Sequence, residues 1–126
     1  MSDGKTSLAP RGPLGVWNAA RWSFKGLRDA FLTESSFRLE VYLFVIAAPL
    51  AFWLGENTLE RLVLFGVLLP VLAMELINSG LECVIDKLIP EFHELAGRAK
   101  DMGSAAVFVC MMNVLVVWTV LLWPQS

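Results

Sequence analysis

The chain has 126 residues, of which 56% are hydrophobic and only 17% are charged, and its formal net charge is −2. It is too short for several domains and too apolar for an ordinary water-soluble one. This composition predicts a single integral membrane domain spanning residues 1–126. Nothing in the charge indicates a nucleic-acid partner.

Residues 1–13 are polar and rich in Gly and Pro, without the apolar core of a signal peptide, so we expect a flexible tail. Over residues 15–32 the pattern is that of an amphipathic helix lying on the membrane surface. The alternative to this membrane-surface helix is a cationic helix packed on a soluble partner. The pattern consists of an apolar stripe, Trp17, Ala20, Phe24, Leu27 and Phe31, bordered by the bases Arg21, Lys25 and Arg28.

Three apolar segments are long enough to cross a membrane, and we place them at residues 33–55, 58–86 and 102–123. Thr33 and Ser36 offer capping oxygens for the first helix, and Thr58 offers one for the second. Pro49 and Pro70 predict kinks. Residues 87–101 are polar and predict a connection between the second and third spans.

Basic residues set the expected orientation. With three spans, the N-terminal segment and the 87–101 connection share one side and hold nine of the ten Lys and Arg residues, which leaves Arg61 for the other side. By the positive-inside rule the first side, with the N-terminus, is cytosolic.

An acidic stripe interrupts the second span near its cytosolic end. At about 100° per residue, five polar residues share one helix face. Charged groups at membrane depth cost at least roughly 2.5–3.5 kcal/mol each on insertion scales, so a partner, water or metal must face them. The alternative is a polar seam that only fixes helix pairing. The stripe comprises Glu75, Asn78, Ser79, Glu82 and Asp86.

The chemistry of these residues suits phosphoryl transfer. Carboxylates of Glu34 and Glu82, with Asn78 nearby, suit a hard cation such as Mg²⁺, which takes few protein carboxylates and completes its shell with water and phosphate. Arg98 and Lys100 can neutralise phosphate oxygens. Glu75, the deepest acid, is the candidate general base for a lipid hydroxyl. No P-loop or soluble-kinase motif is present, and His93 alone is weak evidence for a metal.

The motifs resemble those of the prokaryotic diacylglycerol kinases, a family of small integral-membrane lipid kinases. The resemblance covers nearly the whole chain from about Gly15. Its motifs are Trp22-Ser23-x-Lys25-Gly26-Leu27-Arg28, Glu34-x-x-Phe37-Arg38-x-Glu40, the acidic stripe, and Glu91-Phe-His-Glu94-Leu-Ala-Gly97-Arg98-Ala-Lys100-Asp101-Met-Gly-Ser104-Ala-Ala.

This resemblance implies an all-α membrane protein with three transmembrane helices and a surface helix, assembled as a homotrimer in the bacterial inner membrane. It implies phosphorylation of diacylglycerol to phosphatidic acid, with ATP as donor and Mg²⁺ as cofactor. The implied residues are Glu75 and Asn78 for catalysis; Glu34 and Glu82 for the metal; Trp22, Glu91, Phe92, His93, Lys100 and Asp101, with the metal ligands, for the nucleotide; and Ser23, Arg28, Arg38, Glu40 and Ser104, with Glu75, for the lipid.

Some positions depart from the family pattern. Family members often have Arg where this chain has Gly15, and Tyr where it has Trp22 and Phe92. Arg11 or Arg21 are both candidates to replace the missing guanidinium. Related Gram-positive enzymes phosphorylate undecaprenol, so an undecaprenol kinase is the alternative enzyme.

Two other classes of function are open at this point. The acids could form a proton or cation pathway, although residues 62–74 and 102–123 contain no acid or base to complete one. They could instead only pair with Arg38 or Arg98 in an interaction protein. Cys83 and Cys110 lie in apolar runs without metal or disulfide spacing.

Overall fold

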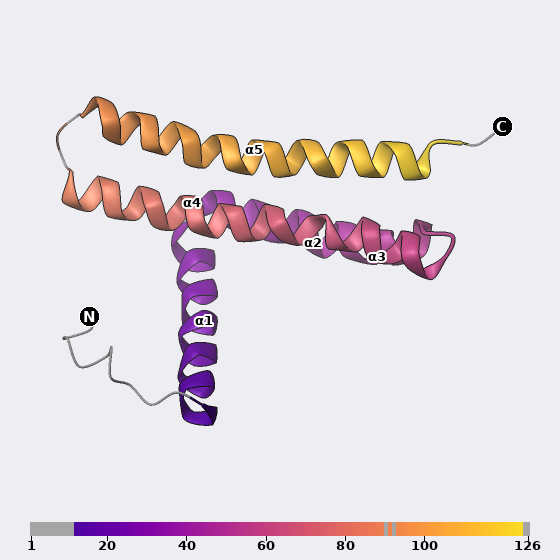
Figure 1. Cartoon of the computed structure of the whole chain (residues 1–126), viewed down its shortest axis with the longest axis horizontal. Coiled ribbons are helices and arrows are strands. Elements are labelled where there is room, and N and C mark those ends of the chain that lie inside the picture. The colour runs from indigo at the N-terminus through magenta and orange to yellow at the C-terminus, as the bar shows by residue number, and fades with distance from the viewer. Residues whose placement is uncertain (1–11, 90, 92, 125–126) are drawn as a thin grey trace.

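The computed structural model describes residues 12–89, 91 and 93–124, and within them the chain forms helices without a strand. There are five helices in this part of the chain (Figure 1). They are α1 (Pro13–Thr33), α2 (Ser35–Leu54), α3 (Thr58–Gly66), α4 (Leu68–Leu88) and α5 (Glu94–Leu122).

Three stretches are long and apolar enough to cross a membrane: α2, the combined stretch Thr58–Leu88 of α3 and α4, and α5. These stretches run alongside one another, and α4 packs most extensively on α5 (Figure 1). The predicted all-α class with three spans is therefore confirmed. Most large apolar side chains on these helices are exposed in the isolated chain, as expected where lipid or another subunit covers them.

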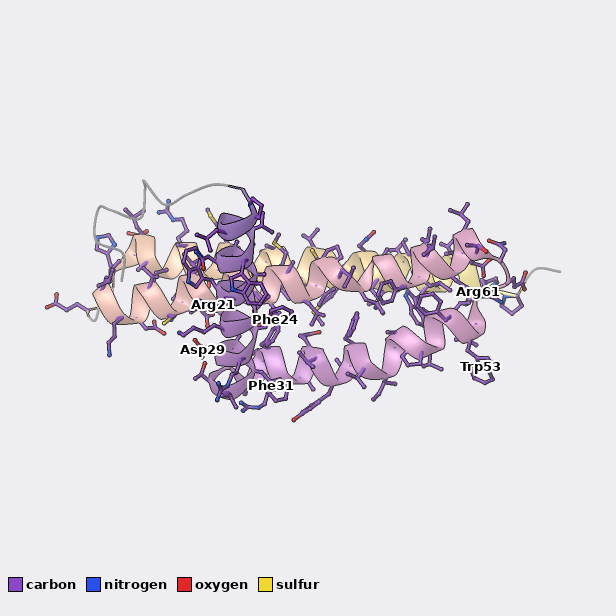
Figure 2. The ribbon with its side chains drawn as sticks, turned by 90° about the horizontal axis from the view of Figure 1, so that it is seen from below. Arg21, Phe24, Asp29, Phe31, Trp53 and Arg61 are labelled. Atoms are coloured by element: carbon purple, nitrogen blue, oxygen red, sulfur yellow. The ribbon has the colours of Figure 1, made fainter. Side chains whose placement is uncertain are left out.

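Helix α1 runs across the other helices (Figure 1) and buries none of its residues. Phe24 and Phe31 lie on the side of α1 that faces the α2–α3 turn. Arg21 and Asp29 lie on the opposite side, toward the α4–α5 connection (Figure 2). A helix with this division of side chains suits the surface of a membrane, with its aromatic side toward the acyl chains. It begins at Pro13, a residue favoured in the first turn, so Pro13 belongs to the helix and not to the predicted tail. Of the rest of that tail, Gly12 is described, and residues 1–11 lie outside the described residues.

The predicted helix caps were wrong at two positions. Thr33 is the last residue of α1 and its Oγ1 donates backward to the Asp29 carbonyl at 2.7 Å, while Glu34 occupies the N-cap position of α2 without a side-chain capping bond. At the next helix, Asn57 and not Thr58 is the cap, because its Oδ1 accepts a 2.9 Å hydrogen bond from the Glu60 N–H. Capping preference allowed both Asn57 and Thr58, whereas it favoured Thr33 over Glu34, so at the first helix the geometry of the α1–α2 corner overrode that preference.

The second span is interrupted at Val67, three residues before Pro70, where the sequence predicts a kink. Pro70 falls in the first turn of α4, in which a missing N–H is tolerated. The carbonyl of Leu64, at the end of α3, accepts a 3.1 Å hydrogen bond from Trp118 Nε1 of α5. The interruption is thus fixed by a side chain 54 positions away. Helix α2, by contrast, continues through Pro49.

The predicted polar connection at 87–101 is much shorter in the structure. Helix α4 continues to Leu88 and α5 begins at Glu94, so α5 starts before the predicted Met102. His93 is its N-cap, with Nδ1 accepting a 3.1 Å hydrogen bond from the Leu95 N–H. The polar residues after it are helical because one face of this first part of α5, including the buried Ala96, packs inward.

Candidate active site

The acidic stripe of α4 is partly buried in protein. Glu75, Asn78 and Ser79 are only 6%, 8% and 6% exposed, and they are the buried polar residues among those described. Glu82 is half-buried one turn further on. The spacing of three and four residues places them on one side of α4. The sequence therefore located a polar face inside an otherwise apolar helix correctly.

A cleft of about 320 Å³ opens along this face, and three helices contribute to it. Glu34 lies at the α1–α2 junction, and Ser104 lies on α5, so residues far apart in the sequence meet here. The lining combines serine, amide and carboxylate groups with apolar side chains. The cleft is lined by Glu34, Ser36, Glu75, Asn78, Ser79, Glu82, Ser104, Val107, Phe108 and Met111.

Sequence reasoning missed the apolar residues of this lining. Val107, Phe108 and Met111 follow Ser104 on α5 at spacings of three, four and seven residues, so they share its face. Once Ser104 is assigned to the site, helical periodicity finds them. Ser36, predicted as a capping residue, lies in the first turn of α2 and lines the cleft.

The position of Glu34 is set by the corner between α1 and α2. Its backbone N–H donates to the Ala30 carbonyl at 2.8 Å, which ends α1, and its own carbonyl accepts from the Arg38 N–H at 3.1 Å, which begins α2. Arg38 Nη1 also donates to the carbonyls of Phe31 and Leu32, at 2.9 and 3.1 Å. These carbonyls lack partners within α1, so Arg38 closes the end of that helix. Arg38 therefore holds the corner that carries Glu34.

The cleft acids lie close to one another, and the base whose charge reaches one of them is Lys100, which acts on Glu82. Glu40, Glu82 and Glu34 are the acids whose negative charge acts on Glu75. In the described part of the chain, none of Glu34, Glu75 and Glu82 forms an ion pair or a side-chain hydrogen bond. Arg98 pairs with Glu94 of its own helix at 3.5 Å. The reading in which the stripe merely pairs with Arg38 or Arg98 thus gains no support, because both guanidinium groups bind elsewhere.

A second cleft, of about 330 Å³, lies where α4 ends and α5 begins. Lys100 Nζ donates a 2.9 Å hydrogen bond to Asp86 Oδ1, and the side chains are 37% and 63% exposed. Asp86, the outermost acid of the stripe, is therefore the charge partner of Lys100. Glu91, His93 and Asp101 line the same cleft, so four of the predicted nucleotide residues are together; Phe92 lies outside the described residues.

The remaining predicted residues lie apart from the Glu75 cleft. Ser23 lines a larger cleft of about 580 Å³ between α1 and α4. Glu34 and Ser79 line both this cleft and the Glu75 cleft. Glu40 borders an apolar cavity of about 230 Å³ between α2, α4 and α5. Trp22 and Arg28 are exposed on α1 and line neither cleft.

The donor set of the first cleft fits a hard divalent cation that arrives with phosphate. The described residues contain no group of three His, Cys, Asp or Glu side chains able to hold a metal alone. Two carboxylates, Glu34 and Glu82, share the cleft with Asn78, whose buried Oδ1 has no hydrogen-bond partner within the part of the chain that the structure describes. Mg²⁺ commonly takes one or two protein carboxylates and leaves its other positions to water and nucleotide oxygens.

Together these features define an all-α membrane protein with a carboxylate-lined cleft at one end of its spans. Comparison with known proteins agrees: residues 21–122 match the prokaryotic diacylglycerol kinase family. The diacylglycerol kinase of Escherichia coli (strain K12) is 42% identical over 110 residues, covering 87% of this chain and 90% of that protein. That of Haemophilus influenzae is 46% identical over 101 residues, covering 80% and 86%, and that of Pseudomonas aeruginosa is 40% identical over 107 residues, covering 85% and 87%. The chain belongs to the prokaryotic diacylglycerol kinase family.

Proposed function

We propose that the chain transfers the γ-phosphoryl group of ATP to the free hydroxyl of diacylglycerol, giving phosphatidic acid and ADP. Family membership over most of the chain supports the reaction class. The observation that carries the chemistry is the buried Glu75, which shares one cleft with the carboxylates of Glu34 and Glu82. An enzyme of this kind needs a proton acceptor beside a metal–nucleotide site, at a depth that a lipid hydroxyl reaches.

Glu75 is the proton acceptor in this mechanism. Its carboxylate takes the proton of the lipid hydroxyl as that oxygen bonds to the γ-phosphorus, and the bond from the γ-phosphorus to the bridging oxygen breaks to release ADP. Glu34 and Glu82 would hold the Mg²⁺. When bound, this cation would neutralise negative charge on the phosphate oxygens. Asn78, in the same cleft wall, orients the groups that meet there.

The nucleotide would extend toward the second cleft. Lys100, with Asp101, Glu91 and His93 nearby, offers a cation for phosphate oxygens and polar groups for the rest of the nucleotide. Phosphate would compete with Asp86 for Lys100, because that ion pair is partly exposed and therefore costs little to open. Phe92 and Trp22 are assigned to nucleotide binding by resemblance alone.

The lipid would approach from the membrane side. Ser104 and Glu75 line the reaction cleft, and Ser23 and Glu40 line the adjoining hollows, while Arg28 on α1 supplies a base at head-group level. Arg38 acts here through the corner that it closes. We place the N-terminus and both clefts on the cytosolic side of the bacterial inner membrane, on the distribution of bases, and infer a homotrimer from the family.

The deciding experiment measures ATP-dependent phosphorylation by the purified full-length chain, with diacylglycerol and undecaprenol assayed side by side. We expect phosphatidic acid to form with Mg²⁺, and formation to stop after chelation and resume when Mg²⁺ is restored. Preferential phosphorylation of undecaprenol would replace the substrate assignment. Ion flux through liposomes without ATP, together with no phosphorylated lipid, would favour the pathway function instead.

A further inference from the structure

Gly103 of α5 faces the side chain of Asn78 across the α4–α5 contact. A Cβ built on Gly103 would collide with Asn78 Oδ1, and would lie 3.3 Å from Asn78 Cγ and 3.2 Å from Leu81 Cδ2. Gly26, Gly66 and Gly80 differ, because a Cβ there meets nothing within 4 Å. At position 103 the absence of a side chain is therefore a requirement of the space beside Asn78.

The Asn78 amide is held in place by packing and not by a hydrogen bond. Asn78 is 8% exposed, and its Oδ1 is buried without a partner among the described residues. A buried amide oxygen without a partner costs stability, so its retention in the cleft wall points to a role with a ligand. With no hydrogen bond to fix it, the direction of this side chain depends on the surface against which it lies, and that surface is Gly103.

We propose that Gly103 is a positioning residue, which keeps the Asn78 amide in its place beside Glu75 and Glu82. This inference rests on the proposed function of the same cleft. An added methyl group would turn the short Asn78 side chain away, since its end moves more easily than two packed helices do. The change would therefore act on the alignment of the reacting groups, where a displacement of about 1 Å can slow a reaction on the order of 100-fold.

Activity should consequently fall in Gly103→Ala while stability is kept. Alanine is a better helix former than glycine, so helix propensity alone would make Gly103→Ala a neutral or stabilising change. A small residue that only allows close helix packing would instead lose stability and activity together when enlarged. The separation of kcat from thermal stability distinguishes the two roles.

The experiment compares purified full-length variants for diacylglycerol phosphorylation and thermal unfolding in the same detergent. For Gly103→Ala we expect kcat to fall about 10- to 100-fold, with the KM for Mg·ATP and the unfolding temperature close to those of the wild type. Gly66→Ala, in which the added methyl meets nothing, is the matched control and should keep the wild-type kcat. Equal kcat values in the two variants would overturn the proposal.

Two double variants identify the contact that matters. Gly103→Ala with Leu81→Val removes the second close contact but leaves Asn78 displaced, so kcat should stay low; recovery would assign the effect to packing on Leu81 and contradict the proposal. In an Asn78→Ala background, Gly103→Ala should cause no further fall in kcat and no loss of folding, whereas an additive loss would again contradict it. An inactive wild type would defeat the proposed function and this inference together, but an active wild type with an unaffected Gly103→Ala defeats the inference alone.

Discussion

The two ends of the helical spans treat their polar groups differently. At the end with the α2–α3 turn, Asn57 caps α3 and Arg61 Nε donates to the Gly55 carbonyl at 3.0 Å. Trp118 Nε1 donates a hydrogen bond to the Leu64 carbonyl. These bonds satisfy backbone groups that the helix ends leave free. Glu60 Oε1, also at this end, is a buried oxygen without a hydrogen-bond partner in residues 12–89, 91 and 93–124. The turn end is otherwise closed by its own side chains.

At the opposite end, the chain gathers acids that it does not neutralise. Glu34, Glu75 and Glu82 line one cleft and form no ion pair in the described part of the chain, although the charge of Lys100 acts on Glu82 from the neighbouring cleft. Groups of like charge held together cost stability, and proteins accept that cost where a ligand uses the groups. The difference between the ends indicates that polar groups at the turn end maintain the fold, whereas those at the cleft end are left available for the proposed chemistry.

The largest effect is expected for Glu75→Gln. This change keeps the size of the side chain but removes the proton acceptor, so diacylglycerol phosphorylation should fall by about 10³-fold or more, within the range of lost acid–base catalysis. Binding of a non-hydrolysable ATP analogue should persist. Glu60→Gln, at an acid of the turn end, is the control and should leave the rate unchanged. Phosphorylation retained by Glu75→Gln would remove Glu75 from the mechanism.

The next largest effect is expected for the two proposed metal ligands, Glu34 and Glu82. Glu34→Gln or Glu82→Gln should reduce activity about 10- to 100-fold, because one of two charged ligands is lost. The loss should be larger at low Mg²⁺ concentration and partly recovered at high concentration, which a Mg²⁺ titration of initial rates measures. Glu56→Gln, an exposed acid of the turn, is the control. A fall in rate that no Mg²⁺ concentration relieves would argue that these acids have another role.

A change at the turn end should affect stability and spare activity. Trp118→Phe removes the indole N–H and leaves the Leu64 carbonyl without its donor, which costs about 1 kcal/mol. Thermal unfolding should shift down by a few degrees while kcat stays within about twofold, since the change is far from the chemistry. Trp53→Phe, at a residue that is 77% exposed, is the matched control. A large loss of activity in folded Trp118→Phe would show that the two ends are coupled.

The smallest effect is expected for Asn57→Gly. Glycine replaces a capping asparagine at a cost of only a few tenths of a kcal/mol, whereas Asn57→Ala should cost about 1 kcal/mol. Unfolding measurements on the two variants should therefore rank glycine above alanine, with phosphorylation unchanged in both. The reverse order would mean that the Asn57 bond to the Glu60 N–H does not contribute as a cap.

Much of the architecture could be predicted because the signals are local. The uncharged runs gave the spans, and the alternation of aromatic and basic residues gave α1. Helical periodicity placed Glu75, Asn78 and Glu82 on one face. The acids of α4 and Glu34 were expected at one level because the number of spans fixes which ends meet.

What could not be predicted depends on contacts between helices. The polar residues from Glu94 to Asp101 look like a loop by composition, yet they continue α5 because one face of them packs on the protein. The choice of Asp86 as the partner of Lys100, and of Trp118 for the Leu64 carbonyl, requires the register of α5 against its neighbours. The need for glycine at position 103 appears only when Asn78 is in view.

The central claim, that the metal and nucleotide bind at the cleft end, is tested most directly by locating a paramagnetic ion. In a background lacking Cys83 and Cys110, a nitroxide is attached through Phe108→Cys, which borders the cleft, or through Trp53→Cys, near the turn. Along the direction of the spans, positions 108 and 53 are separated by much of the length of α2, a helix that rises roughly 1.5 Å per residue. Mn²⁺ with a non-hydrolysable ATP analogue should broaden the spectrum of the label at 108 and leave that at 53 unchanged. Equal broadening at both positions, or broadening only at 53, would contradict the account.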